Sequence, residues 1–303
     1  MSSDMDTTRE ERQAIQVDPT TGIRQEVAFF GSGQLRKFGC THHPAGSAIA
    51  GVVVCPPLQS EFLVNYRREF VLARSLALRG FAVQRFHYRG TGHSDGDSSN
   101  ATFSSMRADA AEAATWLTEL TGVSRVAFVG ARWGGLIAAA AASDVDGAPL
   151  ALWEPVVDGS RYFREVFRTL QIQGLSQGRP AKPTADIVED LRRVGTLDVL
   201  GFAIDLPLYE SSTGHALIDE LGHRPRAVLV IQIDRTDRLR LEYADLVARW
   251  QGMGFAVDTH LLLGQEAWWF REWRQDREMS GRGELLAQIT ADWIAARFAE
   301  GET

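Results

Sequence analysis

The residues that point most directly to chemistry are Gly130-Ala131-Arg132-Trp133-Gly134, between a short apolar run and an alanine-rich segment. Two glycines four residues apart, after a strand and before a helix, are typical of a nucleophile elbow, a sharp turn that exposes the side chain at its tip. The glycines are needed because the turn brings its backbone close to its neighbours. The tip residue here is Arg132 instead of a serine.

Arg132 cannot attack a carbonyl, because a guanidinium stays protonated at physiological pH. At the start of a helix it adds to free N–H groups and a helix dipole that favour negative charge. One candidate anion is internal, in a salt bridge with Glu61 or Asp237. The other is a substrate carboxylate, phosphate or developing oxyanion, with Glu61 or Glu266 as acid or base. The sequence leaves both open.

The sequence does not supply both of the other members of a hydrolytic triad, an acid and a histidine, at their expected positions. Asp237 stands where the acid is expected. Asp234, after the same strand, is a close rival, and Glu154 is a rival at the end of another strand. The histidine should follow the last predicted strand, 256–263, but no histidine stands there, and His260 lies too early, inside the strand. Conventional serine hydrolysis would therefore need a nucleophile outside the elbow.

Other reactive side chains are better explained as structural. Cys55 has no neighbour in sequence that would activate its thiol, and Ser60 and Ser94 lie in turns where serine is common. The spacing of the histidines suggests no metal site, and we expect neither a metal nor a cofactor. The histidines considered were His42, His43, His87, His93, His215 and His223.

Several apolar side chains are expected to contact a substrate. Trp268 and Trp269 follow the last predicted strand and would wall an apolar pocket or pack under the C-terminal helix. Pro57 and Leu58 precede Glu61, and Trp133 follows Arg132. We therefore predict that these five residues bind substrate.

The elements that must position these residues alternate between strand and helix, which favours a parallel sheet. A hairpin opens the chain at 23–41, and a helix is predicted at 66–79 after a loop at 58–65. The predicted strands are 48–55, 81–88, 123–129, 150–155, 227–232 and 256–263, and the other helices are 103–120, 161–170, 185–194, 243–251 and 284–298.

The alternation of strands and helices stops between residues 158 and 222, where short helical segments alternate with loops that contain Gly and Pro. We predict that this segment is an inserted helical cap over the site. Residues 23–157 and 223–303 would form the core, and 1–22 a flexible tail. The predicted fold class is therefore α/β: a mostly parallel central sheet with helices on both faces and a cap.

The elbow and the turn Tyr88-Arg89-Gly90-Thr91-Gly92-His93-Ser94-Asp95-Gly96 resemble those of the α/β-hydrolase superfamily. The chain looks most like the second exosortase-associated hydrolase family, in which a Pro-Pro loop carries a glutamate and the elbow holds arginine. The matching residues are Pro56 to Glu61, Arg132, Leu152 to Gly159 and Leu197 to Phe202. The resemblance implies a hydrolase fold from about residue 24 to the C-terminus.

The amino-acid composition limits the kinds of partner that the protein is expected to bind. The 303 residues are 45% hydrophobic, so a large core can form. A net charge of −7 without a basic run argues against nucleic acid. The N-terminus has no apolar core of signal-peptide length, and no later run approaches the length of a membrane span. With only two distant cysteines, we expect a cytoplasmic protein. We expect a small-molecule or carrier-attached acyl substrate, and a homodimer is compatible with these data.

Two functions follow from these residues. The first is an atypical enzyme for hydrolysis or transfer of an acyl group in an ester or thioester, acting without a Ser-His-Asp triad. The second is a pseudoenzyme, in which the same fold binds an anionic small molecule or a protein. The absence of both serine and histidine from their expected positions is the best support for the second, and the enzyme is the preferred interpretation.

Overall fold

The computed structural model describes residues 14–31, 33–176, 178, 180–222, 224, 226–263 and 276–300. Nine strands form one sheet in the order β1-β2-β3-β5-β4-β6-β7-β10-β11. The pairs from β1 to β5 are antiparallel, and those from β5 through β4 to β11 are parallel. The sheet therefore has an antiparallel edge on a parallel body, in which the carboxyl ends of the strands meet at one side.

The central parallel strands are buried and mostly apolar because helices cover both of their faces. All residues of β4 (Ala50–Cys55), β5 (Phe81–Phe86), β6 (Val126–Ala131) and β7 (Leu150–Trp153) are buried. β10 (Ala227–Asp234) and β11 (Ala256–Leu263) complete this half of the sheet, with β11 at the edge. These strands lie close to the ranges that the sequence predicts.

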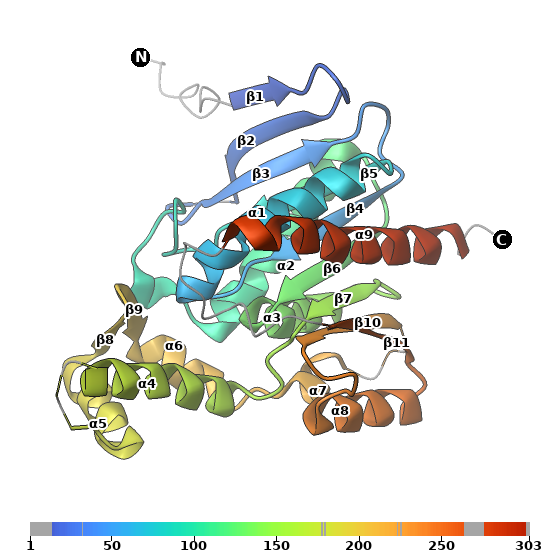
Figure 1. Cartoon of the computed structure of the whole chain (residues 1–303). Helices are drawn as coiled ribbons and strands as arrows, with labels where there is room; N and C mark the ends of the chain where they lie inside the picture. The colour runs from blue at the N-terminus through green and yellow to red at the C-terminus, as the bar shows by residue number, and fades with distance from the viewer. Residues whose placement is uncertain are drawn as a thin grey trace, which may run out of the picture.

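Two layers of helices enclose the sheet (Figure 1). α1 (Gln59–Ala77) and α9 (Asp276–Glu300) share a core with one face, in which Leu72, Leu76 and Ile294 are fully buried. α2 (Phe103–Thr121), α3 (Trp133–Ala142) and α8 (Leu241–Gly252) pack on the other. A single 3-10 turn, η1 (Ser98–Asn100), precedes α2.

The start of α1 differs from the prediction. We expected a loop at 58–65 and a helix from residue 66, whereas the helix begins at Gln59. Its first two turns were missed because Ser60, Glu61 and Asn65 break the apolar pattern. Glu61 and Asn65 are nevertheless buried, since they face polar partners. Glu61 therefore lies in the first turn of a helix and not in a loop.

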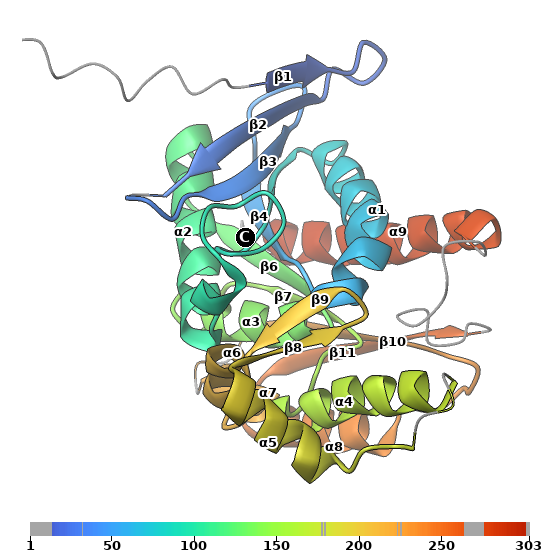
Figure 2. The ribbon, with the colours of Figure 1, turned by 90° about the vertical axis from the view of Figure 1, so that its left-hand side faces the viewer.

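The segment that we expected to form a cap lies between β7 and β10. It contains the long helix α4 (Gly159–Ser176), α5 (Thr184–Val194), the hairpin β8 (Thr196–Val199) and β9 (Phe202–Asp205), α6 (Leu206–Ser212) and α7 (Leu217–Glu220). Figure 2 shows α4, α5, α6 and the hairpin gathered together at one end of the molecule. We refer to residues 158–222 as the cap.

The expected tail at 1–22 is partly structured. Residues 14–17 form β1, an exposed edge strand that pairs antiparallel with β2 (Arg24–Phe30). β2 in turn pairs with β3 (Lys37–His43) in the predicted hairpin. β1 escaped prediction because all four of its residues are exposed, so it carries no alternating apolar pattern.

Candidate functional site

The elbow forms between β6 and α3 as its spacing predicts. Arg132 has φ 52° and ψ −120°, a strained conformation that a non-glycine residue rarely adopts. A Cβ on Gly130 would lie 2.2 Å from the carbonyl oxygen of Gly134, and one on Gly134 would lie 2.2 Å from that of Cys55. Both glycines are therefore required for the close packing that holds Arg132 at the tip.

Glu61 is the buried partner of Arg132. The Arg132 Nε donates to Glu61 Oε1 at 3.0 Å, and both side chains are less than one-tenth exposed. The Tyr162 hydroxyl of α4 donates to the other oxygen, Glu61 Oε2, at 3.4 Å. The internal salt bridge that the sequence allowed is thus formed with Glu61, and it fixes the direction of the guanidinium.

Burial and pairing act in opposite directions on this carboxyl. Burial raises the pKa of Glu61 above its ordinary value, while the charge and hydrogen bond of Arg132 and the hydrogen bond of Tyr162 oppose that rise. Glu61 is therefore a carboxyl that can take up a proton at modest cost if its partner is removed. Arg132 remains charged throughout.

A cavity of about 850 Å³ lies between the elbow and the cap. Arg132 lines it, as do the first two turns of α1, the loop after β7, one face of α4 and the start of α8. A volume of this size accommodates a small organic ligand. Arg132 therefore faces a ligand-sized space from the tip of the elbow while Glu61 holds it from behind.

Glu165 of α4 is a second carboxylate at Arg132, and it lines the cavity. Its Oε2 lies 3.4 Å from Arg132 Nη2, and its side chain is 42% exposed. Arg161 lies 3.3 Å from the other oxygen of Glu165 and also binds Glu242 of α8. Charged side chains of alternating sign therefore run from the elbow across the cavity wall.

The rival acids are placed differently from our expectation. Asp237, the favoured one, is exposed and is not among the residues that line the cavity. Glu154 is fully buried at the end of β7 and accepts from Ile233 N at 3.0 Å and from Arg240. Asp234 pairs with Arg240 at 3.2 Å. The side chain of Asp237, in the turn after β10, is exposed to solvent and is not directed into the cavity with Arg132.

The expected apolar contacts also need correction. Trp133 is fully buried and packs against Phe103 and Tyr162, at ring-centroid distances of 6.1 and 5.1 Å. Pro57 and Leu58 are buried as well, and none of the three lines the cavity. Side chains next to an elbow fill the core because the turn exposes only its tip. Glu266, Trp268 and Trp269 lie outside the described residues.

None of the histidines in the described part of the chain lines the cavity. His87 is buried, its Nδ1 accepts from His93 N at 3.0 Å, and burial lowers its pKa to about 4. His215 lies beside Glu220, and His260 is half-buried in β11. Cys55 is fully buried, which raises the pKa of its thiol far above the physiological range. Ser60 alone of the considered hydroxyls lines the cavity.

The sequence did not single out Arg161 and Tyr162, which are neighbours on α4, or Glu165, which lies one turn later. The pair Arg161 and Glu165 has the i, i+4 spacing of opposite charges, but that spacing is common on solvated helices. Only the position of α4 over the elbow distinguishes these residues, and no signal in the sequence gives that position.

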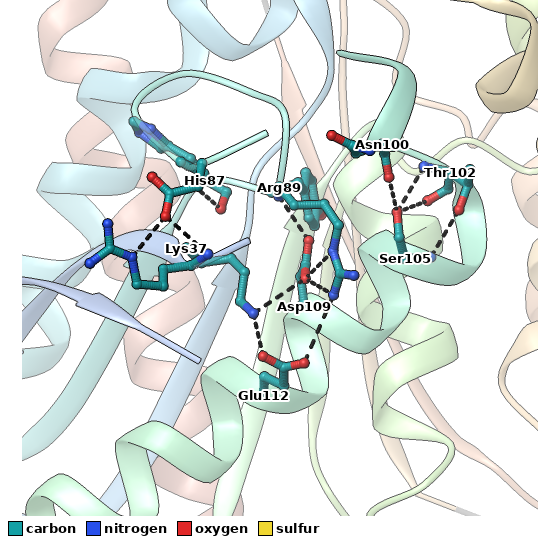
Figure 3. A network of polar contacts seen from close by, with 12 residues as sticks. Lys37, His87, Arg89, Asn100, Thr102, Ser105, Asp109 and Glu112 are labelled. Carbon is teal, nitrogen blue, oxygen red and sulfur yellow. Dashed lines mark hydrogen bonds and ion pairs between the residues drawn. The ribbon is translucent and has the colours of Figure 1, made fainter. Parts of the chain in front are cut away.

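A second buried ionic cluster lies outside the cavity lining (Figure 3). Asp109 of α2 is fully buried and accepts from the backbone N and the Nε of Arg89, both at 2.8 Å. Lys37 of β3 is 1% exposed, lies 3.8 Å from Asp109 and pairs with Glu112. This cluster ties the glycine-rich turn after β5 to α2 and β3, and we call it the Asp109 cluster.

Comparisons with known proteins agree with this architecture. The family model of the alpha/beta hydrolase fold matches residues 57–149. The fold is similar to that of Est1E from Butyrivibrio proteoclasticus with ferulic acid bound, with a TM-score of 0.63 and 15% identity over 90% of this chain and 99% of that one. No curated protein matches the sequence significantly.

Two further solved structures give the same result. An esterase from Pyrococcus furiosus has a TM-score of 0.59 and 12% identity, with 92% of each chain covered. Carboxyl esterase 2 of the fungus Tuber melanosporum has a TM-score of 0.58 and 15% identity over 93% of this chain and 88% of that one. The chain therefore has the α/β-hydrolase fold, as the sequence predicts. Among its described helices, none is both long and apolar enough to cross a membrane.

Proposed function

We propose that the protein is a hydrolase-type enzyme that cleaves or transfers the acyl group of an ester or thioester in the cavity beneath α4, without a covalent acyl-enzyme. One observation carries this proposal: the strained elbow holds a charged arginine, in place of a nucleophile, against a cavity of about 850 Å³. A cation fixed there by Glu61 is suited to stabilise negative charge that develops on a carbonyl oxygen.

Glu165 is the best-placed base for such a reaction, because it lines the cavity beside Arg132 and is open to solvent. A water molecule gives a proton to Glu165 as its oxygen bonds to the carbonyl carbon. The carbonyl oxygen becomes negative and faces Arg132. The C–O or C–S bond then breaks, and the leaving alcohol or thiol takes the proton from Glu165. In transfer, an acceptor alcohol or thiol replaces the water.

Glu61 has a different task in this proposal. It is buried behind Arg132 and is not among the cavity-lining residues, so it positions the guanidinium. Asp237 takes no part because it is exposed outside the cavity lining. The pairing of Arg132 with Glu61 also supports the narrower resemblance, to the second exosortase-associated hydrolase family, whose arginine and glutamate these residues match.

The test is turnover of short and long acyl esters and thioesters by the wild-type protein and two variants. We expect Arg132→Met to lose about 100- to 1000-fold in kcat and Glu165→Gln about 100-fold, both with the native fold by circular dichroism. Glu189→Gln, on the exposed cap helix α5, is the matched control and should keep full activity. Wild-type protein that turns over no member of the panel, or an Arg132→Met variant with unchanged kcat, would contradict the proposal.

A further inference from the structure

The cavity beneath α4 is elongated. Its lining includes Arg161, Glu165, Thr169 and Ile172, which follow one face of α4 for three turns. The eleven steps along the helix from Arg161 to Ile172 correspond to a length of about 16 Å. The space that Arg132 faces therefore continues along the helix, far beyond what an acyl carbon and its leaving group require.

The cavity lining combines charged and apolar side chains. Near the start of α4, its lining includes the charged residues Asp158, Arg161, Arg240 and Glu242. Three large apolar side chains also line it, each from a different element: Leu63 of α1, Ile172 of α4 and Leu200 of the cap hairpin. These three are 47%, 59% and 47% exposed. Arg168, one turn before Ile172 on α4, lines it as well. Apolar side chains that converge on a cavity and remain exposed form a binding surface for apolar matter.

Leu200 is placed there against its backbone preference. The hairpin β8-β9 turns through two residues, Leu200 and Gly201, with φ 55° and 85°. This is the pattern of a type I′ turn, whose first position favours asparagine, aspartate or glycine because other side chains are strained in that region. A leucine at this position is strained, and it gains little burial in return because it is half exposed. The hairpin therefore holds an apolar side chain over the cavity at a cost to its own stability.

We propose that Leu63, Ile172 and Leu200 bind the aliphatic chain of the substrate, so that the enzyme acts on esters or thioesters of linear acids of medium or long chain. This inference rests on the proposed function for the site at Arg132. In this proposal an extended aliphatic chain lies along α4, with the acyl carbon beside Arg132 and the chain end at Leu200. Each methylene that the chain buries adds to binding.

The experiment measures binding and turnover separately. Calorimetry gives the affinities of dodecanoate and butyrate, which carry the same carboxylate on chains of different length. We expect wild-type protein to prefer dodecanoate, and Leu200→Asn and Ile172→Asn each to lose roughly tenfold in dodecanoate affinity with butyrate unaffected. Leu175→Asn is the matched control, because Leu175 is as exposed as Ile172 on the same helix (58% and 59%) but does not line the cavity.

The unfolding temperature of Leu200→Asn is a second measurement, and it should change in the direction opposite to that of most substitutions. Asparagine suits the turn, so we expect this variant to unfold at a temperature about 1–2 °C higher while it binds dodecanoate more weakly. A leucine with only a structural role would give a lower unfolding temperature and an unchanged affinity. Equal affinity of wild type and Leu200→Asn for dodecanoate would overturn the inference.

The failure of the two proposals can be told apart. If wild-type protein binds dodecanoate with the expected dependence on Leu200 but hydrolyses no dodecanoyl ester or thioester, chain binding stands and the proposed enzymatic function fails. If it hydrolyses butyryl and dodecanoyl substrates with equal kcat/KM, and Leu200→Asn changes neither, the function stands and the chain-binding inference is overturned.

Discussion

Two clusters of buried charge in this protein differ in what they face. In the Asp109 cluster the carboxylate is fully buried and is held by Arg89 and Lys37, and neither Asp109 nor its partners line the cavity. In the cluster at the elbow, Glu61 is also buried, but its partner Arg132 lines a cavity of about 850 Å³. The first cluster joins elements of the fold, whereas the second presents a charge held by Glu61 to the cavity.

This difference shows why buried ion pairs alone do not identify a functional site. Burial of charge is costly wherever it occurs, and protein partners offset that cost in both clusters. What separates them is the open side: Glu165 beside Arg132 is 42% exposed in the cavity wall, so a ligand can join the elbow cluster without breaking the Glu61 pair. We therefore expect substitutions in the first cluster to change stability, and those in the second to change activity.

The largest effect on stability is expected from Asp109→Ala. It leaves Lys37 and Arg89 without their buried partner, and the free energy of unfolding should fall by about 3–5 kcal/mol, measured by urea unfolding. Glu112→Gln is the control within the same cluster, and because Glu112 is 41% exposed it should cost less than about 1 kcal/mol. Equal losses in the two variants would show that burial does not set the strength of this cluster.

Arg132→Met should cost less stability than Asp109→Ala. Burial already raises the pKa of Glu61, so its carboxyl can take a proton when the arginine is gone, and we expect a loss of about 1–3 kcal/mol. Adding Glu61→Leu should bring the free energy of unfolding to within about 1 kcal/mol of wild type, because no unpaired charge remains. The kcat of the double variant should stay as low as that of Arg132→Met. Recovery of turnover together with stability would remove Arg132 from the reaction.

A smaller effect is expected at Glu69 of α1, a buried acid with a weak partner. Its nearest cation, Arg85, lies 3.9 Å away, and burial raises the pKa of Glu69 from 4.5 to about 7. The folded state therefore holds a proton that the unfolded state releases between these two values. Stability from this group is full below about pH 4.5 and decreases as the pH rises towards and past about pH 7.

The measurement is the difference between wild type and Glu69→Gln in urea unfolding at two pH values. Glutamine keeps the hydrogen bond from Asn65, which is 2.8 Å long in the wild type, and removes the proton equilibrium. Wild type should lose about 1 kcal/mol more than the variant between about pH 6 and about pH 8. Parallel pH profiles would mean that Arg85 keeps Glu69 ionised, as tightly paired as Asp109.

The sequence determined the features that depend on local chain geometry. The central parallel strands are buried and mostly apolar because both of their faces are covered, and β4, β5, β6 and β7 were predicted closely. The elbow could be located because Gly130 and Gly134 are required wherever backbones approach so closely. Local signals failed at the start of α1, where polar residues face buried partners, and at β1, whose residues are all exposed.

Tertiary structure alone decided which groups meet at the elbow. Glu61 and Asp237 were both candidates for Arg132. The choice of Glu61, 71 residues away in sequence, follows from the pairing of β4 with β6, because α1 begins after β4 and the elbow follows β6. The cavity combines residues from α1, the loop after β7, α4, the cap hairpin and α8, so no local pattern reveals it. Neighbouring residues determine the local geometry of the chain, whereas a binding site forms from distant segments that only the packed fold brings together.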